Sequence, residues 1–189
     1  MSRAYRIAVR ESLTKDLKAA DEICSDLEIL EILPKEQMAD LLTGELKGRG
    51  FQEEDGKLVR EDDGVTVTVD PSSGEVNVKA EKADNVKLEV EGQDWGFDDA
   101  GPDEETLRRR LKEHLKGELK ERAEEQEARM RKEASAKLEG ALDEVRKELG
   151  QAVNRVTAEA LKRKAASLGR IKEMTEDAES GSLTIKVEV

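Results

Sequence analysis

Aromatic residues and cysteines are scarce in this sequence. Only four of the 189 residues are aromatic: one Trp, one Tyr and two Phe. A single globular domain of this length would have too few large apolar side chains for its core, so part of the chain must be solvent-exposed helix or disordered. Cys24 is the only cysteine, so no internal disulfide can form and a reducing compartment is expected. We expect Cys24 to be a small apolar residue that is buried or half-buried.

Long apolar runs are also missing. No segment has the roughly 20 consecutive apolar residues that a membrane-spanning helix requires, and the first residues lack the apolar run of a signal peptide. These two absences predict a cytoplasmic protein with no membrane partner.

Catalytic and metal-binding signatures are missing as well. His114 is the only histidine, and one histidine with neighbouring carboxylates supplies too few ligands for a zinc site. The acidic loops at residues 53–56, 62–64 and 98–99 lack the alternating oxygen ligands of a twelve-residue calcium loop. We therefore predict no catalytic residue, no metal and no cofactor, and we expect that the chain is not an enzyme.

Charged residues are abundant, and the balance is acidic. Asp, Glu, Lys and Arg make up 41% of the chain, and the net charge is -12. Residues 102–168 hold seventeen Lys and Arg against fifteen Asp and Glu, so the acidic excess lies outside that range. Nucleic-acid binding needs clustered cations, so no nucleic-acid partner is expected. An acidic surface suits solubility or a basic protein partner.

The first hundred residues predict a small antiparallel sheet with one packed helix. Tyr5, Ile7 and Val9 alternate with polar residues, as in a strand with one wet face. A weaker strand candidate at residues 23–30 follows after a loop or a short helical turn. Pro34 then opens a helix with apolar residues at helical spacing. The predicted fold class is α+β, with further short strands, separated by Asp- and Gly-rich turns, at residues 57–60, 65–69, 75–80 and 86–90.

A very long helix is predicted after this body. Residues 118–139 contain no Gly, Pro, Asn or Asp, and almost every residue there is a strong helix former. The pattern extends from about Pro102 to about Leu168, with apolar residues that recur every three or four positions along one edge. Such a row is typical of a coiled-coil seam, and its members are Leu107, Leu111, Leu115, Leu119, Leu138, Leu142, Val145, Leu149, Val153 and Val156.

Two arrangements of this helix remain open. A continuous helix would form an antiparallel coiled coil in a homodimer, whereas a hairpin that turns near residues 130–138 would make the same contacts within one chain. No residue suited to a helix–helix turn lies there, so we favour the homodimer. Leu183, Ile185 and Val187 alternate with polar residues as a strand that completes a sheet. The predicted segments are an α+β body at 1–100, the long helix at 101–168, a linker at 169–181 and the C-terminal strand at 182–189.

Two groups of residues are candidate partner-binding sites. Trp95 and Phe97 are half of the aromatic residues in the chain, and they would either plug the rim of the core or form a binding hot spot. Basic triplets lie near both ends of the long helix, where they would form a solvated face, dock an acidic partner or make a weak nucleic-acid contact. The triplets comprise Arg108, Arg109, Arg110, Lys162, Arg163 and Lys164.

Segments at both ends of the chain resemble a known family. They read RAYRIAVRESL with LEILEILPKEQMADLL near the amino terminus, and ALKRKAASLG with SLTIKVEV near the carboxyl terminus. Together they are similar to an accessory domain of the bacterial FtsH-like ternary systems, in which an AAA+ ATPase, a von Willebrand A protein and small partner proteins are encoded together. The resemblance implies a non-enzymatic adaptor or scaffold that works beside an ATPase.

The leading functional hypothesis is therefore a cytoplasmic scaffold or adaptor. It would dimerise through the long coiled coil and present its acidic bodies to a protein partner. One alternative is a holdase-like chaperone with a β body and helical arms, which would need exposed apolar residues on the arm, such as Met130. Another alternative is a metal-dependent enzyme that uses the acidic loops.

Overall fold

A computed structural model describes residues 4–97, 101–177 and 182–188 of the chain. Their contacts form two compact units, Met1–Ala20 with Glu81–Ala134 (unit 1) and Asp21–Ala80 with Ser135–Val189 (unit 2). Three elements contribute to both units: β1 (Ala4–Asp26), β5 (Glu75–Phe97) and α2 (Glu104–Leu168). The others belong to unit 2, and they are α1 (Lys35–Gly48), β2 (Gln52–Glu54), β3 (Lys57–Asp62), β4 (Val65–Val69), β6 (Arg170–Asp177) and β7 (Ser182–Glu188). The α+β fold class is as predicted, and the boundary at residue 100 stays a prediction.

The main sheet has five antiparallel strands in the order β1-β5-β4-β3-β2. Two of its turns are two-residue hairpin loops of sequence Asp-Gly. Asp55 and Gly56 join β2 to β3, Asp63 and Gly64 join β3 to β4, and all four have positive φ. Asp-Gly is the usual sequence of such loops because the twist of the strands requires positive φ at both positions. Two of the acidic loops are therefore structural turns.

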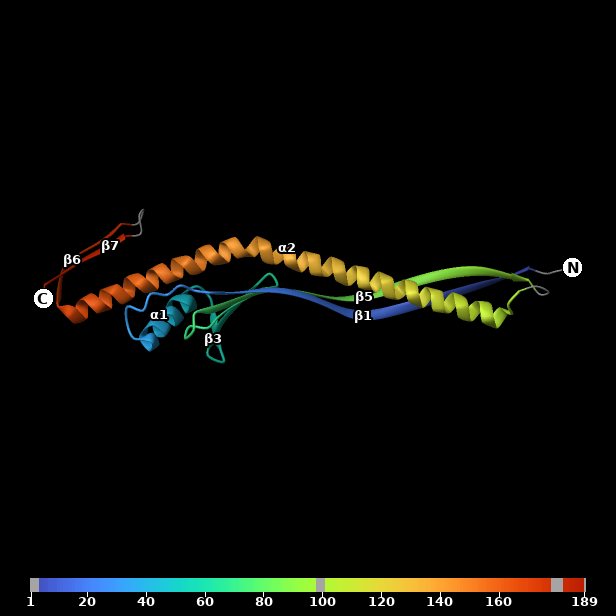
Figure 1. The fold of residues 1–189 in the computed structure, drawn as a ribbon, viewed down its shortest axis with the longest axis horizontal. Coiled ribbons are helices and arrows are strands. Elements are labelled where there is room, and N and C mark those ends of the chain that lie inside the picture. Colours follow the sequence, from blue (N-terminus) through green and yellow to red (C-terminus); the bar gives the residue numbers. More distant parts are fainter. Residues whose placement is uncertain (1–3, 98–100, 178–181, 189) are drawn as a thin grey trace. The chain divides into compact units, whose positions relative to one another are not determined.

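β1 and β5 lie side by side (Figure 1). Each step forward along β1 matches an equal step back along β5, so the two strands are antiparallel with a constant register. The three pairs that establish this register are Arg10 with Glu91, Asp16 with Asn85, and Cys24 with Asn77.

β1 is one strand of 23 residues, whereas the sequence pattern predicts two short strands with a loop or helical turn between them. Odd-numbered positions face the core throughout, and Ile7, Leu17 and Ala19 are buried. The pattern is hard to see in the sequence because three charged residues also occupy odd positions. Each has a partner on α2: Glu11 lies 3.4 Å from Lys112, Lys15 lies 3.6 Å from Glu127, and Asp21 accepts a 2.7 Å hydrogen bond from Ser135.

β5 is also one strand of 23 residues, although the sequence pattern predicts separate strands at 75–80 and 86–90. The composition break at Gly92 marks a close approach of strand and helix instead. A Cβ atom at this glycine would lie only 3.0 Å from side-chain atoms of Leu111 and of Leu115 on α2. Glycine within a strand commonly has this role.

α1 begins after Pro34 and buries Met38, Leu42 and Leu46, in agreement with its sequence pattern. Its end is closed by the backbone, since the amide of Phe51 donates to the carbonyl of Leu46 at 3.1 Å. This chain reversal returns the Phe51 ring to the core, where its side chain is only 3% exposed. The core of unit 2 combines these residues with apolar side chains of β3, β4, β5 and α2.

α2 is one uninterrupted helix of 65 residues (Figure 1), so the chain does not reverse near residues 130–138. Every residue of the predicted seam is buried or half-buried. In unit 1, Leu115 and Leu119 cluster with Val90 of β5, and in unit 2, Leu138 and its successors cluster with the sheet and α1. A row with helical spacing defines an apolar stripe but not what packs on it. Here the same chain's sheet packs on it, and a coiled coil is not shown.

The C-terminal strand pairs with its immediate predecessor and not with the main sheet. Residues 170–177, within the predicted linker, form β6, and β7 pairs antiparallel with it. Ile171 lies opposite Val187, and Met174 lies opposite Ile185. A register shift between Ile171 and Glu173 puts Ile171 and Met174 on the same face. This irregularity conceals the alternation that would otherwise predict a strand.

We predict that Leu138→Ala destabilises the protein by about 2–5 kcal/mol, because it leaves a cavity in a packed core. Leu138 is 1% exposed. The matched control is Leu161→Ala on the same helix, where the side chain is 38% exposed, and its effect should be within about 0.5 kcal/mol. Urea unfolding followed by circular dichroism measures both, and equal losses would contradict the packing of α2 on the sheet.

Candidate functional site

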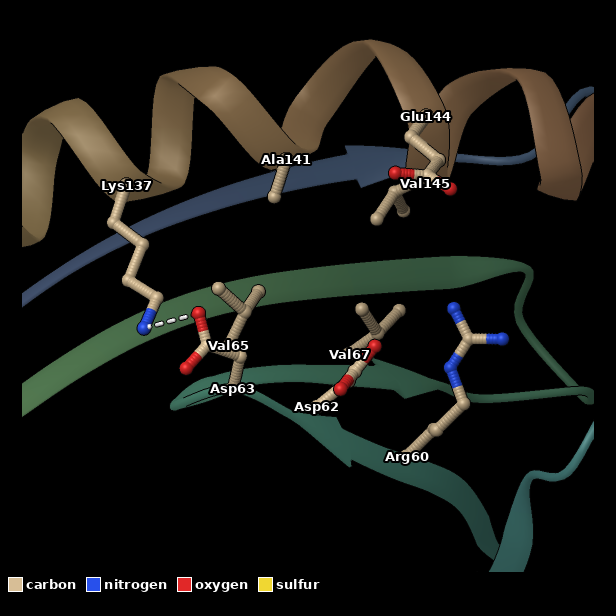
Figure 2. Close-up of a pocket in the computed structure, with 9 residues that line it drawn as sticks. All are labelled: Arg60, Asp62, Asp63, Val65, Val67, Lys137, Ala141, Glu144 and Val145. Carbon is tan, nitrogen blue, oxygen red and sulfur yellow. Dashed lines mark ion pairs between the residues drawn. The ribbon is translucent and has the colours of Figure 1, made fainter.

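The first candidate is a cavity of about 270 Å³ in unit 2, between α2 and the strands β3 and β4 (Figure 2). Its floor is apolar and its rim carries charges of both signs. Lys137 of α2 and Asp63 of the β3–β4 turn form an ion pair of 2.8 Å on the rim. The full lining is Arg60, Asp62, Asp63, Val65, Val67, Lys137, Ala141, Glu144 and Val145.

Arg60 of β3 is held tightly beside this cavity. Its guanidinium donates two hydrogen bonds, of 2.7 and 2.6 Å, to the Glu148 carboxylate on α2. It also lies 4.7 Å above the centre of the Phe51 ring, within the range of a cation–π contact. The hydrogen bond from Arg60 lowers the pKa of Glu148, and the same bond raises the pKa of Arg60.

These contacts join α2 to β3 and to the β3–β4 turn. Both rim cations are already paired, Arg60 with Glu148 and Lys137 with Asp63. The lining contains no Ser, Cys, Thr or His that could act as a nucleophile or a neutral base. Within residues 4–97, 101–177 and 182–188, no three His, Cys, Asp or Glu side chains gather as metal ligands. No sequence pattern indicates the Arg60–Glu148 pair, because its members are 88 positions apart.

The second candidate is an exposed aromatic pair, Trp95 and Phe97, near the end of β5. Alternate residues of a strand face opposite sides, and Gly92 faces α2. Trp95 and Phe97 therefore project from the side of β5 that is turned away from the helix. Trp95 is 61% exposed and Phe97 is 51% exposed. The interpretation of these residues as a plug of the core rim is wrong, and their role as a binding hot spot stays a prediction.

The backbone between the two aromatics is fixed by Tyr5. Gly96 is buried, and a Cβ atom there would lie 2.3 Å from the Tyr5 ring. The ring therefore occupies the space that a larger residue would need. It covers the inner side of β5, so the Trp95 and Phe97 side chains remain on the outer side.

The outer face of unit 1 also carries charged residues that pair with one another. Arg10 and Glu91 form an ion pair of 3.0 Å across the two strands. Lys87 and Glu89 form another of 2.6 Å along β5. Such pairs satisfy their own charges and suit a surface in water. The aromatic pair differs from this surface because more than half of each large apolar residue is exposed.

The basic triplets lie at opposite ends of α2 and belong to different units. Arg108 pairs with Glu104 at 3.3 Å, and Arg163 pairs with Glu159 at 3.2 Å. These are exposed pairs within one helix face. Arg109, Arg110 and Lys164 are exposed as well, and Lys162 is half-buried. Partner binding by the triplets stays a prediction.

Three further predictions concern Met130, Cys24 and the acidic loop at residues 98–99. Met130 is 1% exposed and packs with Leu17 and Ala19, so it offers no client-binding surface for a holdase. Cys24 is exposed and not half-buried, because it occupies an even position on β1, where its Sγ accepts a hydrogen bond of 3.2 Å from Asn77. The third acidic loop, at residues 98–99, lies outside the described residues.

Comparison with known proteins gives one match. The protein-family model described as FtsH ternary system domain X5 matches residues 1–189. No curated protein and no solved structure matches the chain. No helix in the described parts of the chain has both the length and the apolar stretch required to cross a membrane.

We predict that Glu148→Gln destabilises the protein at neutral pH by about 1.5–3 kcal/mol, the usual range for a hydrogen bond to a charged group. Because Arg60 lowers the folded-state pKa of Glu148 below the ordinary 4.5, the stabilisation is complete above that value. It is lost as the pH falls through the lower folded-state pKa. Urea unfolding at pH 7 and at pH 3 measures the effect, and the gap between wild type and variant should shrink at pH 3.

The matched control for this measurement is Glu139→Gln, an exposed position on the same helix. It should change the free energy of unfolding by no more than about 0.5 kcal/mol at either pH. A Glu148→Gln effect that is the same at both pH values would show that the ion pair is not the source of the stabilisation.

Proposed function

This chain belongs to the family FtsH ternary system domain X5, and from that premise we propose that it is a non-enzymatic adaptor that binds a protein of the same ternary system through Trp95 and Phe97. The family description supports an accessory role beside other proteins. The exposed aromatic pair supplies a surface for such a role.

The single observation that carries the proposal is the exposure of Trp95 and Phe97. A chain with 2% aromatic residues has few large apolar side chains for its core, yet two of them lie outside it. Aromatic side chains bury roughly 150–250 Å² each in an interface, and Trp and Tyr with Arg are the residue types enriched in binding hot spots. Rigid support from β5 and Tyr5 reduces the entropy lost on binding.

The partner we propose is the AAA+ ATPase of the ternary system. Adaptors of this kind need no catalytic group of their own, and the paired charges around the unit 2 cavity support a structural rather than a chemical role for that region. We further propose a cytoplasmic location, which the single cysteine, Cys24, supports. The basic triplets remain candidate secondary contacts.

Pairing of two copies is a further part of the proposal. An antiparallel helix–helix seam has little support, because the apolar row of α2 already packs on the sheet of its own chain. A second copy would therefore have to use another surface.

We predict that Trp95→Ala weakens binding of the purified chain to the AAA+ ATPase of its system at least tenfold, since a central aromatic anchor contributes roughly 2 kcal/mol or more. The loss of Phe97 by Phe97→Ala should act in the same direction. Isothermal titration calorimetry measures the dissociation constants. Thermal unfolding should change little, because both side chains are largely exposed.

The control is Gln93→Ala, an exposed position on the same face of β5 two residues before Trp95. It should leave the dissociation constant within about twofold. Wild-type binding that survives both aromatic substitutions would contradict the proposed surface, and the absence of any wild-type binding would contradict the ATPase as partner.

A further inference from the structure

The β6–β7 hairpin is a two-stranded sheet with one apolar face. Among the described residues, β6 and β7 are hydrogen-bonded to each other and to no third strand. None of its apolar side chains is buried, and Met174 is 48% exposed. An isolated two-stranded hairpin is at best marginally stable in water, and it needs further strands or packing against a helix for independent stability. Five apolar residues share this face, Ile171, Met174, Leu183, Ile185 and Val187, and the register partner of Leu183 is Glu176.

The two free edges of this hairpin differ. β6 carries a register shift between Ile171 and Glu173, and such irregularities protect an edge from pairing with another strand. β7 pairs without a register shift from Ser182 to Glu188. Its sequence is rich in β-branched residues, which favour strands. The edge of β7 is therefore the one that remains open to another strand.

The pattern of β7 is symmetric about Ile185. In an antiparallel pair of two β7 strands centred on this residue, Ile185 would lie opposite its own copy. Leu183 would lie opposite Val187, and Thr184 would lie opposite Lys186. Apolar residues then meet only apolar residues on one face. A pair centred one position later would put Lys186 opposite Lys186, and like charges directly opposite are destabilising.

The polar face of the hairpin also permits a second copy to approach. Lys186 pairs with Glu173 at 2.5 Å, and Lys172 pairs with Glu188 at 2.8 Å. These cross-strand pairs leave the four charges balanced within each hairpin. Two copies would therefore meet without net repulsion between these groups.

We propose that β7 pairs antiparallel with β7 of a second copy of this chain, centred on Ile185, to form a four-stranded sheet. Two hairpins together supply the strands that one hairpin lacks. The chain is then a homodimer held by strand pairing and not by a coiled coil. The proposal concerns the purified chain alone, so it stands or fails independently of the aromatic pair and its partner.

Disulfide trapping tests the proposed register directly. In a Cys24→Ser background, Ile185→Cys puts two thiols opposite each other, at a Cα separation of roughly 4.5–5.5 Å, which a disulfide can span. Glu188→Cys is the matched control on the same strand, because its two copies would be six residues apart along the pair, about 20 Å. Mild oxidation followed by non-reducing electrophoresis should give mainly a dimer for Ile185→Cys and little for Glu188→Cys.

Equal trapping of the two variants, or none for Ile185→Cys, would overturn the proposal. A second measurement does not depend on cysteine chemistry. Light scattering coupled to size exclusion should give about twice 21.0 kDa for wild type. Ile185→Lys puts two like charges at the centre of the pair and should reduce the mass to that of one chain. Circular dichroism confirms that this variant keeps its helix content, and a wild type of single-chain mass at all concentrations would also overturn the proposal.

Discussion

The packing of one apolar stripe of α2 against strands of the same chain is the contact on which the rest of the structure depends. In unit 1 the stripe covers one face of β1 and β5, and in unit 2 it completes the core formed by α1 and the strands β3 to β5. Aliphatic side chains make up these contacts because aromatic residues are so few. In proteins, most of the stability of a helix comes from tertiary packing of its apolar face. The stability of α2 therefore depends on this contact.

The same contact decides which residues are available to partners. Because α2 occupies the inner face of β5, the odd-numbered residues near its end point outward, and Trp95 and Phe97 are among them. Gly92 lets the helix approach the strand, and Tyr5 fills the space above Gly96. The exposure of the aromatic pair thus follows from close packing on the opposite face. The helix also uses its own apolar row in this packing, so that row is not free for a second copy.

Charged side chains at the margins of the contact explain why the two long strands were difficult to predict. Glu11, Lys15 and Asp21 occupy core-facing positions of β1, where a strand pattern normally has apolar residues. Each is compatible with that position because a side chain of α2 pairs with it. In β6 the register shift beside Ile171 has a similar effect on the pattern. Both are tertiary or cross-strand features that a single segment does not reveal.

The sequence by itself determined the elements whose signals are local. The long helical segment followed from the lack of helix breakers at residues 118–139, although the sequence left a hairpin within it open. α1 followed from its apolar spacing after Pro34, and the turns from Asp-Gly and Asp-Pro. Only the tertiary structure decided what each apolar face contacts. An apolar stripe on α2 is equally suited to a helix or a sheet, and an aromatic residue on a strand can face the core or the solvent. The choice depends on which side of β5 the helix covers, and that is set by contacts between residues far apart in the chain.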